Sequence, residues 1–209
     1  MKRILLADDH PTIRNGTRQI IENRFTDVEF GEAANANEVF KLVKDQKWDI
    51  IIMDMDMPGR NGLEVIAQLK DQKSKIPILM FSMHPEDQVA IRAFKAGAAG
   101  YLAKDSSGED MVKAIQLVLS GKKYITSFVA EKLASQFENP LNKAPHELLS
   151  DREYQTLLLF GNGKTVSEIA KELSLSVATI STFRARILEK MEMKTNADLV
   201  GYAIRNNLV

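Results

Sequence analysis

The 209-residue chain contains no cysteine and no long apolar run. The absence of cysteine excludes disulfides, thiol catalysis and thiolate metal sites, so any metal ion must be held by oxygen or imidazole ligands. The first apolar run covers only Ile4 to Ala7, which is shorter than a signal peptide or a membrane span requires. We therefore expect a cytoplasmic protein with no membrane partner.

The chain also lacks an excess of charge of either sign, with 28 Lys and Arg residues and 28 Asp and Glu residues. Such a balance argues mildly against nucleic-acid binding until the charge is divided along the chain. Residues 1–121 carry 16 basic and 18 acidic residues, a net charge of −2. Residues 177–191 carry three basic residues and one acidic residue, a net charge of +2. The positive charge is therefore local to the C-terminal part.

Short apolar, β-branched runs alternate with segments of helical period over residues 1–121. The predicted strands are Arg3–Ala7, Val28–Ala33, Ile50–Met53, Ile76–Phe81 and Gly100–Ala103. The predicted helices are Pro11–Arg24, Ala36–Gln46, Gly62–Lys70, Pro85–Ala96 and Gly108–Ser120. Five such βα units predict an α/β fold with a five-stranded, doubly wound parallel sheet. Its ligand crevice is expected at the carboxyl ends of the strands.

The alternation stops after Gly121. Thr126–Phe137 is predicted to be a further helix, and residues 138–145 form a polar segment with two prolines, so we expect a linker with one helix over residues 122–148. Beyond it, over residues 149–209, every periodic segment is helical, and the predicted helices are Asp151–Phe160, Val166–Leu173, Val177–Met191 and Ala197–Asn206. The sequence therefore predicts a second, small all-α domain.

Polar residues end four of the five predicted strands: Asp8 and Asp9, Asp54, Ser82, and Lys104. Like-charged carboxylates are costly to bury together unless a cation such as Mg²⁺ (or Mn²⁺) neutralises them. An acidic pair after a strand is by itself more often an ordinary solvated loop. Five such residues, all at the carboxyl ends of predicted strands, instead favour a phosphoryl-transfer site in which Asp54 is the nucleophile.

The motifs LLADDHP, MDMDMPGRNG, ILMFS and GYLAKD together resemble the receiver domain of two-component response regulators, over about the first 121 residues. The resemblance implies that Asp54 takes a phosphoryl group from a sensor histidine kinase or a small phosphodonor. It also implies that the metal ligands are Asp8, Asp9, Asp54 and the main-chain carbonyl of Asp56. The phosphoryl oxygens would be contacted by Ser82 and Lys104, and the switch residues would be Ser82 and Tyr101. A tyrosine packed only for its ring is an equally good interpretation of Tyr101.

Three positions depart from the common receiver pattern. Asp105 follows Lys104 where many receivers carry proline, and Asp56 and His84 stand two residues after Asp54 and Ser82 respectively. Receivers vary at the latter two places, and the variation is associated with the lifetime of the phosphoryl group. We expect Asp56→Asn to change the rate of self-dephosphorylation without abolishing acceptance.

A helix-turn-helix is predicted over Val166–Leu173 and Val177–Met191, with Ser176 as the N-cap of the second helix. The residues expected to line its core face are Val177, Ile180, Ile187 and Met191. A small-polar and basic front face is suited to the major groove of DNA. Periodicity alone favours the plainer alternative, an amphipathic helix in a bundle.

Residues 149–200 resemble the LuxR-type domain of the NarL/FixJ response regulators almost without a gap. The resemblance implies that Val177–Met191 is the recognition helix and that Ala197–Asn206 serves dimer pairing. The DNA-binding residues that it implies are Lys164, Thr165, Thr179, Ser181, Thr182, Arg184, Ala185, Arg186 and Lys190. Ala178 and Phe183 replace basic residues or histidine found in many relatives, so we expect a shallow salt dependence and a greater need for dimerisation.

The expected protein is thus a transcription regulator rather than an enzyme. Its expected partners are a sensor histidine kinase, promoter double-stranded DNA, a second copy of itself on activation, and RNA polymerase. One alternative is a Mg²⁺-dependent phosphohydrolase, although residues 122–209 offer no substrate cap. A second alternative is a regulator whose DNA binding ignores phosphorylation. The three histidines, His10, His84 and His146, lack the short spacing of zinc sites, and we interpret them as surface or loop residues.

Overall fold

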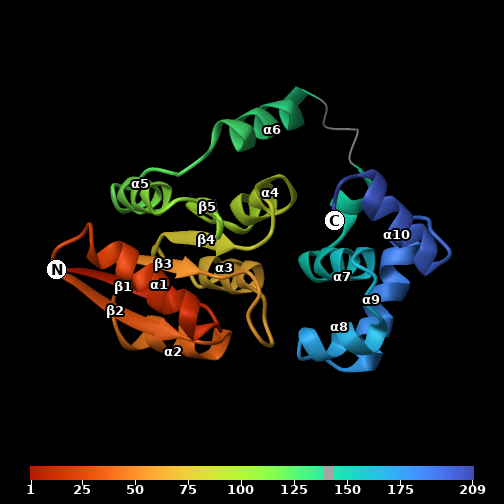
Figure 1. The fold of residues 1–209 in the computed structure, drawn as a ribbon, viewed down its shortest axis with the longest axis horizontal. Coiled ribbons are helices and arrows are strands. Elements are labelled where there is room, and N and C mark those ends of the chain that lie inside the picture. The colour runs from red at the N-terminus through yellow and green to blue at the C-terminus, as the bar shows by residue number, and fades with distance from the viewer. Residues whose placement is uncertain (139–143) are drawn as a thin grey trace. The chain divides into compact units, whose positions relative to one another are not determined.

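The computed structural model describes residues 1–138 and 144–209 (Figure 1). Residues 139–143, which belong to the predicted polar linker, lie outside the described residues. The chain forms two compact units, Met1–Ser135 and Gln136–Val209, and each is described by itself.

The first unit is built on a five-stranded parallel sheet, as predicted. Its strands are β1 (Lys2–Ala7), β2 (Val28–Ala33), β3 (Ile50–Met53), β4 (Ile78–Ser82) and β5 (Gly100–Ala103), in the order β2-β1-β3-β4-β5. The chain reverses its direction of travel across the sheet between β2 and β3, on either side of β1. This is the switch point at which doubly wound sheets open a crevice beyond the carboxyl ends of their strands.

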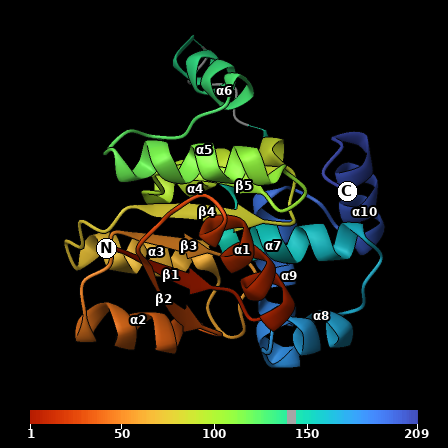
Figure 2. The ribbon, with the colours of Figure 1, turned by 60° about the vertical axis from the view of Figure 1, so that its left-hand side comes forward.

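Helices cover both faces of the sheet (Figures 1 and 2). The covering helices are α1 (Pro11–Glu22) and α5 (Gly108–Leu119) on one face, and α2 (Ala36–Asp45), α3 (Gly62–Asp71) and α4 (Glu86–Ala96) on the other. Side chains alternate accordingly, because Ile4 and Leu6 join the core under α1 and α5 whereas Leu5 joins the opposite core. Burial on both faces explains why the central strands are apolar throughout.

Strand β4 begins and ends later than predicted, at Ile78 and Ser82 instead of Ile76 and Phe81. Pro77 has no N–H group to donate, and its carbonyl accepts from the Ile51 N–H at 3.0 Å. The ladder then continues with Ile51 opposite Ile78. The shift makes Ser82 the last residue of the strand, fully buried at the carboxyl edge of the sheet.

The chain after α5 stays on the first unit. Tyr124 forms a parallel bridge with Gly100, which extends the sheet beyond β5. Helix α6 (Ser127–Glu138) follows; just before it, the Thr126 hydroxyl donates to Glu86 Oε1 at 2.7 Å. Val129 is fully buried in the core that α4 also covers. The start of the predicted extra helix is therefore tied to the α4–β5 side of the sheet.

The second unit is all-helical, as predicted. It consists of a short 3₁₀ turn, η1 (Pro145–Leu148), which was not predicted, followed by α7 (Asp151–Gly161), α8 (Val166–Glu172), α9 (Val177–Lys190) and α10 (Asn196–Arg205). Ser150, Thr165 and Thr195 open helices α7, α8 and α10 with reciprocal capping boxes. These caps satisfy backbone N–H groups that the first turns would leave without partners. Helix boundaries in this unit are therefore set locally.

One predicted core residue of this unit is not in the core. Ile180 and Ile187 are fully buried and Met191 is 5% exposed, but Val177 is 52% exposed. Val177 is the first residue of α9, so it projects from the end of the helix before the buried stripe begins. Periodicity identifies a helix face but does not indicate where the neighbouring helices stop covering it.

Candidate functional site

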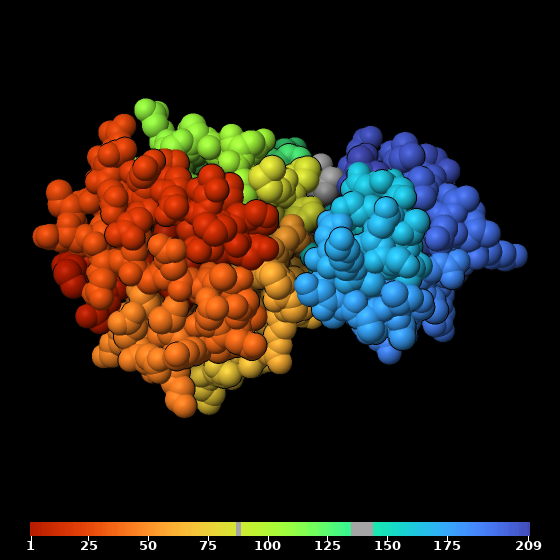
Figure 3. Space-filling model, turned by 60° about the horizontal axis from the view of Figure 1, so that its bottom comes forward, coloured from red at the N-terminus to blue at the C-terminus, as the bar shows by residue number. Residues whose placement is uncertain are grey.

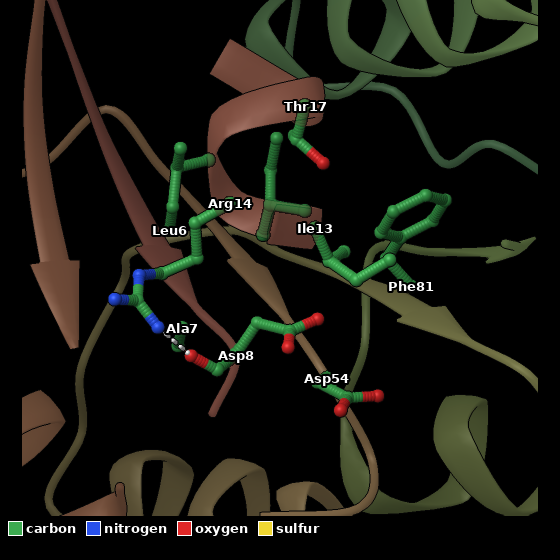
Figure 4. A pocket seen from close by; sticks show the side chains of 9 residues that line it. Leu6, Ala7, Asp8, Ile13, Arg14, Thr17, Asp54 and Phe81 are labelled. Carbon is green, nitrogen blue, oxygen red and sulfur yellow. Dashed lines mark hydrogen bonds between the residues drawn. The ribbon is translucent and has the colours of Figure 1, made fainter. Parts of the chain in front are cut away.

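Three aspartates meet at the carboxyl ends of β1 and β3. Because Ala7 and Met53 are paired neighbours, the chain leaves the two strands side by side. One carboxylate oxygen each of Asp8, Asp9 and Asp54, together with a ring nitrogen of His10, lie within 4.8 Å of one another. Figure 4 shows the carboxylates of Asp8 and Asp54 next to each other beside α1. The prediction that these three carboxylates lie close together at one edge of the sheet is thus confirmed.

A lysine neutralises part of this charge. Lys104 Nζ lies 2.6 Å from Asp8 Oδ2 and 3.1 Å from Asp54 Oδ2, and its side chain is 5% exposed. The Lys104 N–H donates to the Ser82 carbonyl at 2.7 Å, which fixes the residue at the end of β5 next to β4. Burial lowers the pKa of Lys104, but the Asp54 and Asp8 carboxylates outweigh it and raise the pKa above its ordinary value. The lysine is therefore a fixed cation.

The surroundings of the Asp54 carboxyl group disfavour its charged form. Its pKa is raised to about 7, mainly by burial and in part by the nearby Asp8 carboxylate, although Lys104 opposes both effects. Asp9 Oδ1 is shielded from solvent and accepts no hydrogen bond from any residue that the structure describes. A site that concentrates buried carboxylate oxygens without enough donors fits a divalent cation held by oxygen ligands.

Ser82 and Tyr101 connect the site to the segment after β4. The Ser82 hydroxyl accepts the His84 N–H at 3.2 Å, and the Tyr101 hydroxyl donates to the His84 carbonyl at 2.5 Å. Tyr101 is 1% exposed, and burial raises the pKa of its hydroxyl. The Tyr101 ring is thus packed in the core, and its hydroxyl is also hydrogen-bonded to the segment between β4 and α4.

Asp56 and His84 form a contact that the sequence analysis did not anticipate. His84 Nε2 lies 2.8 Å from Asp56 Oδ2, so the segments that follow β3 and β4 are joined by their side chains. Burial lowers the pKa of His84, but Asp56 outweighs it and the net pKa is raised. His84 is a loop residue, as predicted, but the prediction did not include its pairing with Asp56, because sequence spacing does not reveal that these two loops are adjacent.

Two residues that support the site were missed. Arg14 on α1 donates to the Asp8 carbonyl at 2.6 Å and pairs with Glu32 at 2.9 Å, so it holds the chain at the end of β1 (Figure 4). Gly62 lies where a β-carbon would stand 2.3 Å from the Asp54 carbonyl oxygen. The asparagine-glycine pair at the start of α3 was the available signal, since glycine often marks a close backbone approach.

In the second unit, α9 presents a polar face opposite its buried stripe. Its exposed residues there are Ala178, Ser181, Thr182, Ala185, Arg186 and Glu189. Figure 3 shows the outer surface of the helical unit in cyan to blue. Residues spaced by three or four positions share a helix face, so this set forms a continuous strip. Its members include four of the residues expected to contact DNA.

Several cations expected to contact DNA already have partners within this unit. Lys164 pairs with Glu172, Lys190 Nζ lies 2.6 Å from Glu153 Oε2, and Arg184 Nε donates to Asn196 Oδ1 at 2.5 Å. Burial raises the pKa of Glu153, but Lys190 and Ser150 outweigh it, and the net pKa is lowered. For Arg186, in contrast, no ion pair or side-chain hydrogen bond is found among the described residues.

The hydroxyls on and beside α9 are also engaged. Thr165 caps α8, the Thr179 hydroxyl lies 2.7 Å from that of Ser176, and the Thr182 hydroxyl donates to the Ala178 carbonyl at 2.9 Å. Each hydroxyl keeps acceptor capacity in such a bond. Ser181 and Ala185 leave room on the exposed strip because their side chains are small.

Within the described ranges, no helix combines the length and apolar content that a bilayer crossing would require.

Comparisons with known proteins agree with this arrangement. Residues 4–116 match the response regulator receiver domain family, and residues 147–203 match the luxR family of bacterial regulatory proteins. Response regulator UvrY of Escherichia coli is 35% identical over 209 residues, covering 100% of this chain and 96% of that protein. Response regulator GacA of Pseudomonas aeruginosa is 35% identical over 211 residues, covering 100% of this chain and 98% of that protein.

Solved structures share the fold. A two-component response regulator of the LuxR family from Aurantimonas is 36% identical, with a TM-score of 0.58, over 65% of this chain and 97% of that chain. RcsB from Salmonella enterica serovar Typhimurium, solved bound to a promoter with phosphomimetic BeF3⁻, has a TM-score of 0.65 at 23% identity, over 97% of this chain and 98% of that chain.

The resemblance noted on the sequence is thereby confirmed. The chain belongs to the two-component response regulators of the NarL/FixJ type, DNA-binding transcription regulators under phosphorylation control that join a receiver domain to a LuxR-type helix-turn-helix.

Proposed function

We propose that Asp54 is the phosphoryl acceptor through which this regulator is controlled. The observation that carries the proposal is the convergence of three carboxylates and Lys104 at one edge of the sheet. A carboxylate oxygen of Asp54 attacks the phosphorus of a sensor kinase phosphohistidine or of acetyl phosphate. The bond from phosphorus to the donor breaks, its electron pair leaves with the donor, and an acyl phosphate forms on Asp54.

The carboxylate set fits Mg²⁺ or Mn²⁺, since it offers clustered oxygens, one of them shielded and without a donor. Asp8, Asp9, Asp54 and the main-chain carbonyl of Asp56 would hold the ion. The bound cation would neutralise the carboxylates and the charge on the phosphoryl oxygens. Lys104 stays protonated beside Asp54 and stabilises the same charge from the side of β5.

Phosphorylation then shifts a population of conformations. New phosphoryl oxygens compete for Lys104 and for the Ser82 hydroxyl, which now accepts the His84 N–H. Because Tyr101 is bonded to the His84 carbonyl, a change at Ser82 alters the chain between β4 and α4. We infer that this change alters dimer or interdomain contacts and thereby DNA binding.

The exposed strip of α9 is the proposed reading surface for promoter DNA. Ser181, Thr182 and Ala185 would face base edges, whereas Arg186 and neighbouring cations would contact phosphates. The recognition helix carries few cations without partners, which supports binding as a homodimer.

We keep as predictions the division of the chain into domains at residues 1–121, 122–148 and 149–209. The two partners, a sensor histidine kinase and RNA polymerase, are predictions as well.

The test compares the full chain with its Asp54→Asn variant, each with and without acetyl phosphate. We expect the unchanged protein to gain one phosphoryl group by mass spectrometry, to associate in sedimentation, and to enrich specific fragments from a random DNA pool. The variant should do none of these in response to acetyl phosphate. Glu189→Gln, which keeps Asp54 and alters the other domain, should still be phosphorylated.

Two outcomes would contradict the proposal. Phosphorylation of the Asp54→Asn variant at the same rate would assign acceptance to another residue. Normal phosphorylation of the unchanged protein without any effect on association or DNA enrichment would instead favour a regulator whose DNA binding ignores phosphorylation.

A further inference from the structure

We propose that the imidazole of His10 is a nitrogen ligand of the divalent cation at the acidic site, and that it favours Mn²⁺ over Mg²⁺ there. The inference rests on the proposed function, because it concerns the same cation site. It replaces the interpretation of His10 as a plain surface histidine.

The position of the ring is the first reason. His10 Nδ1 lies 2.7 Å from Asp9 Oδ1 and 3.4 Å from Asp8 Oδ1. One ring nitrogen and one oxygen of each aspartate, including Asp54, are within 4.8 Å of one another. Ligands about 2.1–2.2 Å from one ion are separated by at most about 4.4 Å, so only small side-chain movements bring all four onto it.

The surroundings of Asp9 Oδ1 are the second reason. This oxygen is shielded from solvent, and the His10 ring nitrogen 2.7 Å away is the only group found to pair with it in the part of the chain that the structure describes. A carboxylate oxygen and a ring nitrogen this close to each other can bind the same cation. The ring is thus placed where it can act as a ligand.

The backbone holds the ring at this place. The His10 N–H donates to Asp8 Oδ1 at 2.8 Å, and Pro11 follows, which restricts His10 to an extended conformation with φ −92° and ψ 109°. His10 occupies the N-cap position of α1, but its side chain makes no capping bond. Its side chain is 67% exposed, so a hydrated ion can reach the ring from solvent.

The chemistry of the ligand decides the selectivity. Mg²⁺ prefers oxygen ligands and gains little from imidazole, whereas Mn²⁺ and the later divalent metals accept a neutral imidazole nitrogen readily. A site with three carboxylates and one imidazole therefore favours Mn²⁺ more than the carboxylates alone would. The expected signature is a change in the ratio of the two affinities.

The first measurement uses Mn²⁺ as the probe with the untagged full chain, whose only histidines are His10, His84 and His146. Electron spin echo modulation of bound Mn²⁺ should show coupling to ¹⁴N that is replaced by ¹⁵N coupling when histidine is labelled. His10→Ala should remove the coupling, and the matched variant His146→Gln should keep it. Bound Mn²⁺ without histidine coupling in the unchanged protein would overturn the inference.

The second measurement is titration calorimetry with Mn²⁺ and with Mg²⁺. His10→Ala should weaken Mn²⁺ binding roughly tenfold or more but Mg²⁺ binding by less than about twofold. Equal weakening for both ions would overturn the inference, since it would mean that His10 only shapes the carboxylates. His10→Asn, which keeps a polar side chain, should behave like His10→Ala.

Asp9→Asn separates the inference from the proposed function. Loss of both ions in Asp9→Asn together with an unchanged affinity ratio in His10→Ala would reject only the role of His10. Undiminished binding of both ions in Asp9→Asn would reject the cation site itself, and the inference with it.

Discussion

At the scale of single residues, the acidic site places buried carboxylates close together, which costs the folded protein stability. Asp8 and Asp54 are 5% and 4% exposed, and Lys104 is the only lysine or arginine found within ion-pair distance of the Asp54 carboxylate in the described chain. Buried like charges raise the free energy of the folded state unless they are fully compensated. Strain of this kind is expected where a protein must present a reactive carboxylate.

Asp54→Asn is therefore expected to stabilise the protein when divalent cations are removed. The pKa of Asp54 is raised from its ordinary value of 3.8 to about 7, mainly by burial, so the folded state binds a proton that the unfolded state has lost. Stability of the unchanged protein then falls as the pH rises from about 4 to 7. At pH 8 in EDTA we expect the variant to unfold with a free energy higher by roughly 1–3 kcal/mol.

Urea unfolding at pH 5 and at pH 8 checks this prediction. The advantage of Asp54→Asn should shrink at pH 5, where the unchanged Asp54 is largely protonated. Asp105→Asn, at an exposed neighbouring position, is the matched control and should show no such pH dependence. An Asp54→Asn variant less stable at pH 8 would contradict the idea that the buried charge is costly.

Asp56→Asn is expected to speed the loss of the phosphoryl group without preventing acceptance. The His84 ring lies 2.8 Å from the Asp56 carboxylate, and this contact joins the segments after β3 and β4 next to Asp54. A neutral amide weakens the contact and opens the site to water, so we expect a several-fold shorter half-life. Decay of protein labelled with radioactive phosphate measures it.

The control for that experiment is His84→Asn, which breaks the same contact from the other side. Both variants should accelerate decay by similar factors if the contact limits water access. An unchanged half-life in Asp56→Asn would reject the prediction. Opposite effects in the two variants would assign the change to the charge of Asp56 rather than to the contact.

At the scale of helices and strands, local chemistry sets most of the boundaries. Ser176 opens α9, and its hydroxyl accepts the Thr179 N–H at 3.0 Å. Three other helices of the same unit begin with reciprocal caps. Such caps fix where a helix starts and therefore which residues fall on its exposed face.

Ser176→Ala is expected to destabilise the DNA-binding unit by about 1 kcal/mol, because one backbone N–H at the start of α9 loses its acceptor. Thermal unfolding of the full chain, followed by a probe in the helical unit, measures the change. Ser181→Ala is the matched control, since it removes a hydroxyl from the exposed middle of the same helix and should alter stability by less than about 0.5 kcal/mol. Equal effects would mean that the cap contributes nothing specific.

At the scale of the whole molecule, we expect charge pairing to limit how strongly one copy binds DNA. Lys164, Lys190 and Arg184 each have a partner within the helical unit. A cation that must leave a carboxylate to reach a phosphate contributes less to binding than a cation without a partner. A second copy then becomes the simplest source of further phosphate contacts.

The salt dependence of DNA binding tests this view. With a fragment selected by the purified protein, Arg186→Ala should reduce the slope of log K against log salt by about one, and Lys164→Ala should reduce it less. Glu172→Gln releases Lys164 from its partner and should steepen the slope. Fluorescence anisotropy at several salt concentrations measures all three, and equal slopes for Arg186→Ala and Lys164→Ala would contradict the pairing argument.

Much of this protein follows from its sequence. The alternation of apolar runs with helical segments predicted all five strands, and polar residues just past Ala7 and Met53 predicted an acidic site at the carboxyl edge of the sheet. The strand pattern fixes the topology of a doubly wound sheet, and this topology places the residues that follow the strands at one edge.

Other features depended on contacts between segments far apart in the chain. Val177 is exposed at a position where periodicity predicted burial, because it is the first residue of α9 and lies at the end of the helix. The pairing of His84 with Asp56 and the proximity of His10 to Asp54 involve loops that only the folded sheet brings together. Local sequence thus determined the elements and the chemistry at their ends, whereas the packing of the sheet decided which of those groups touch, since contact depends on distance in space and not along the chain.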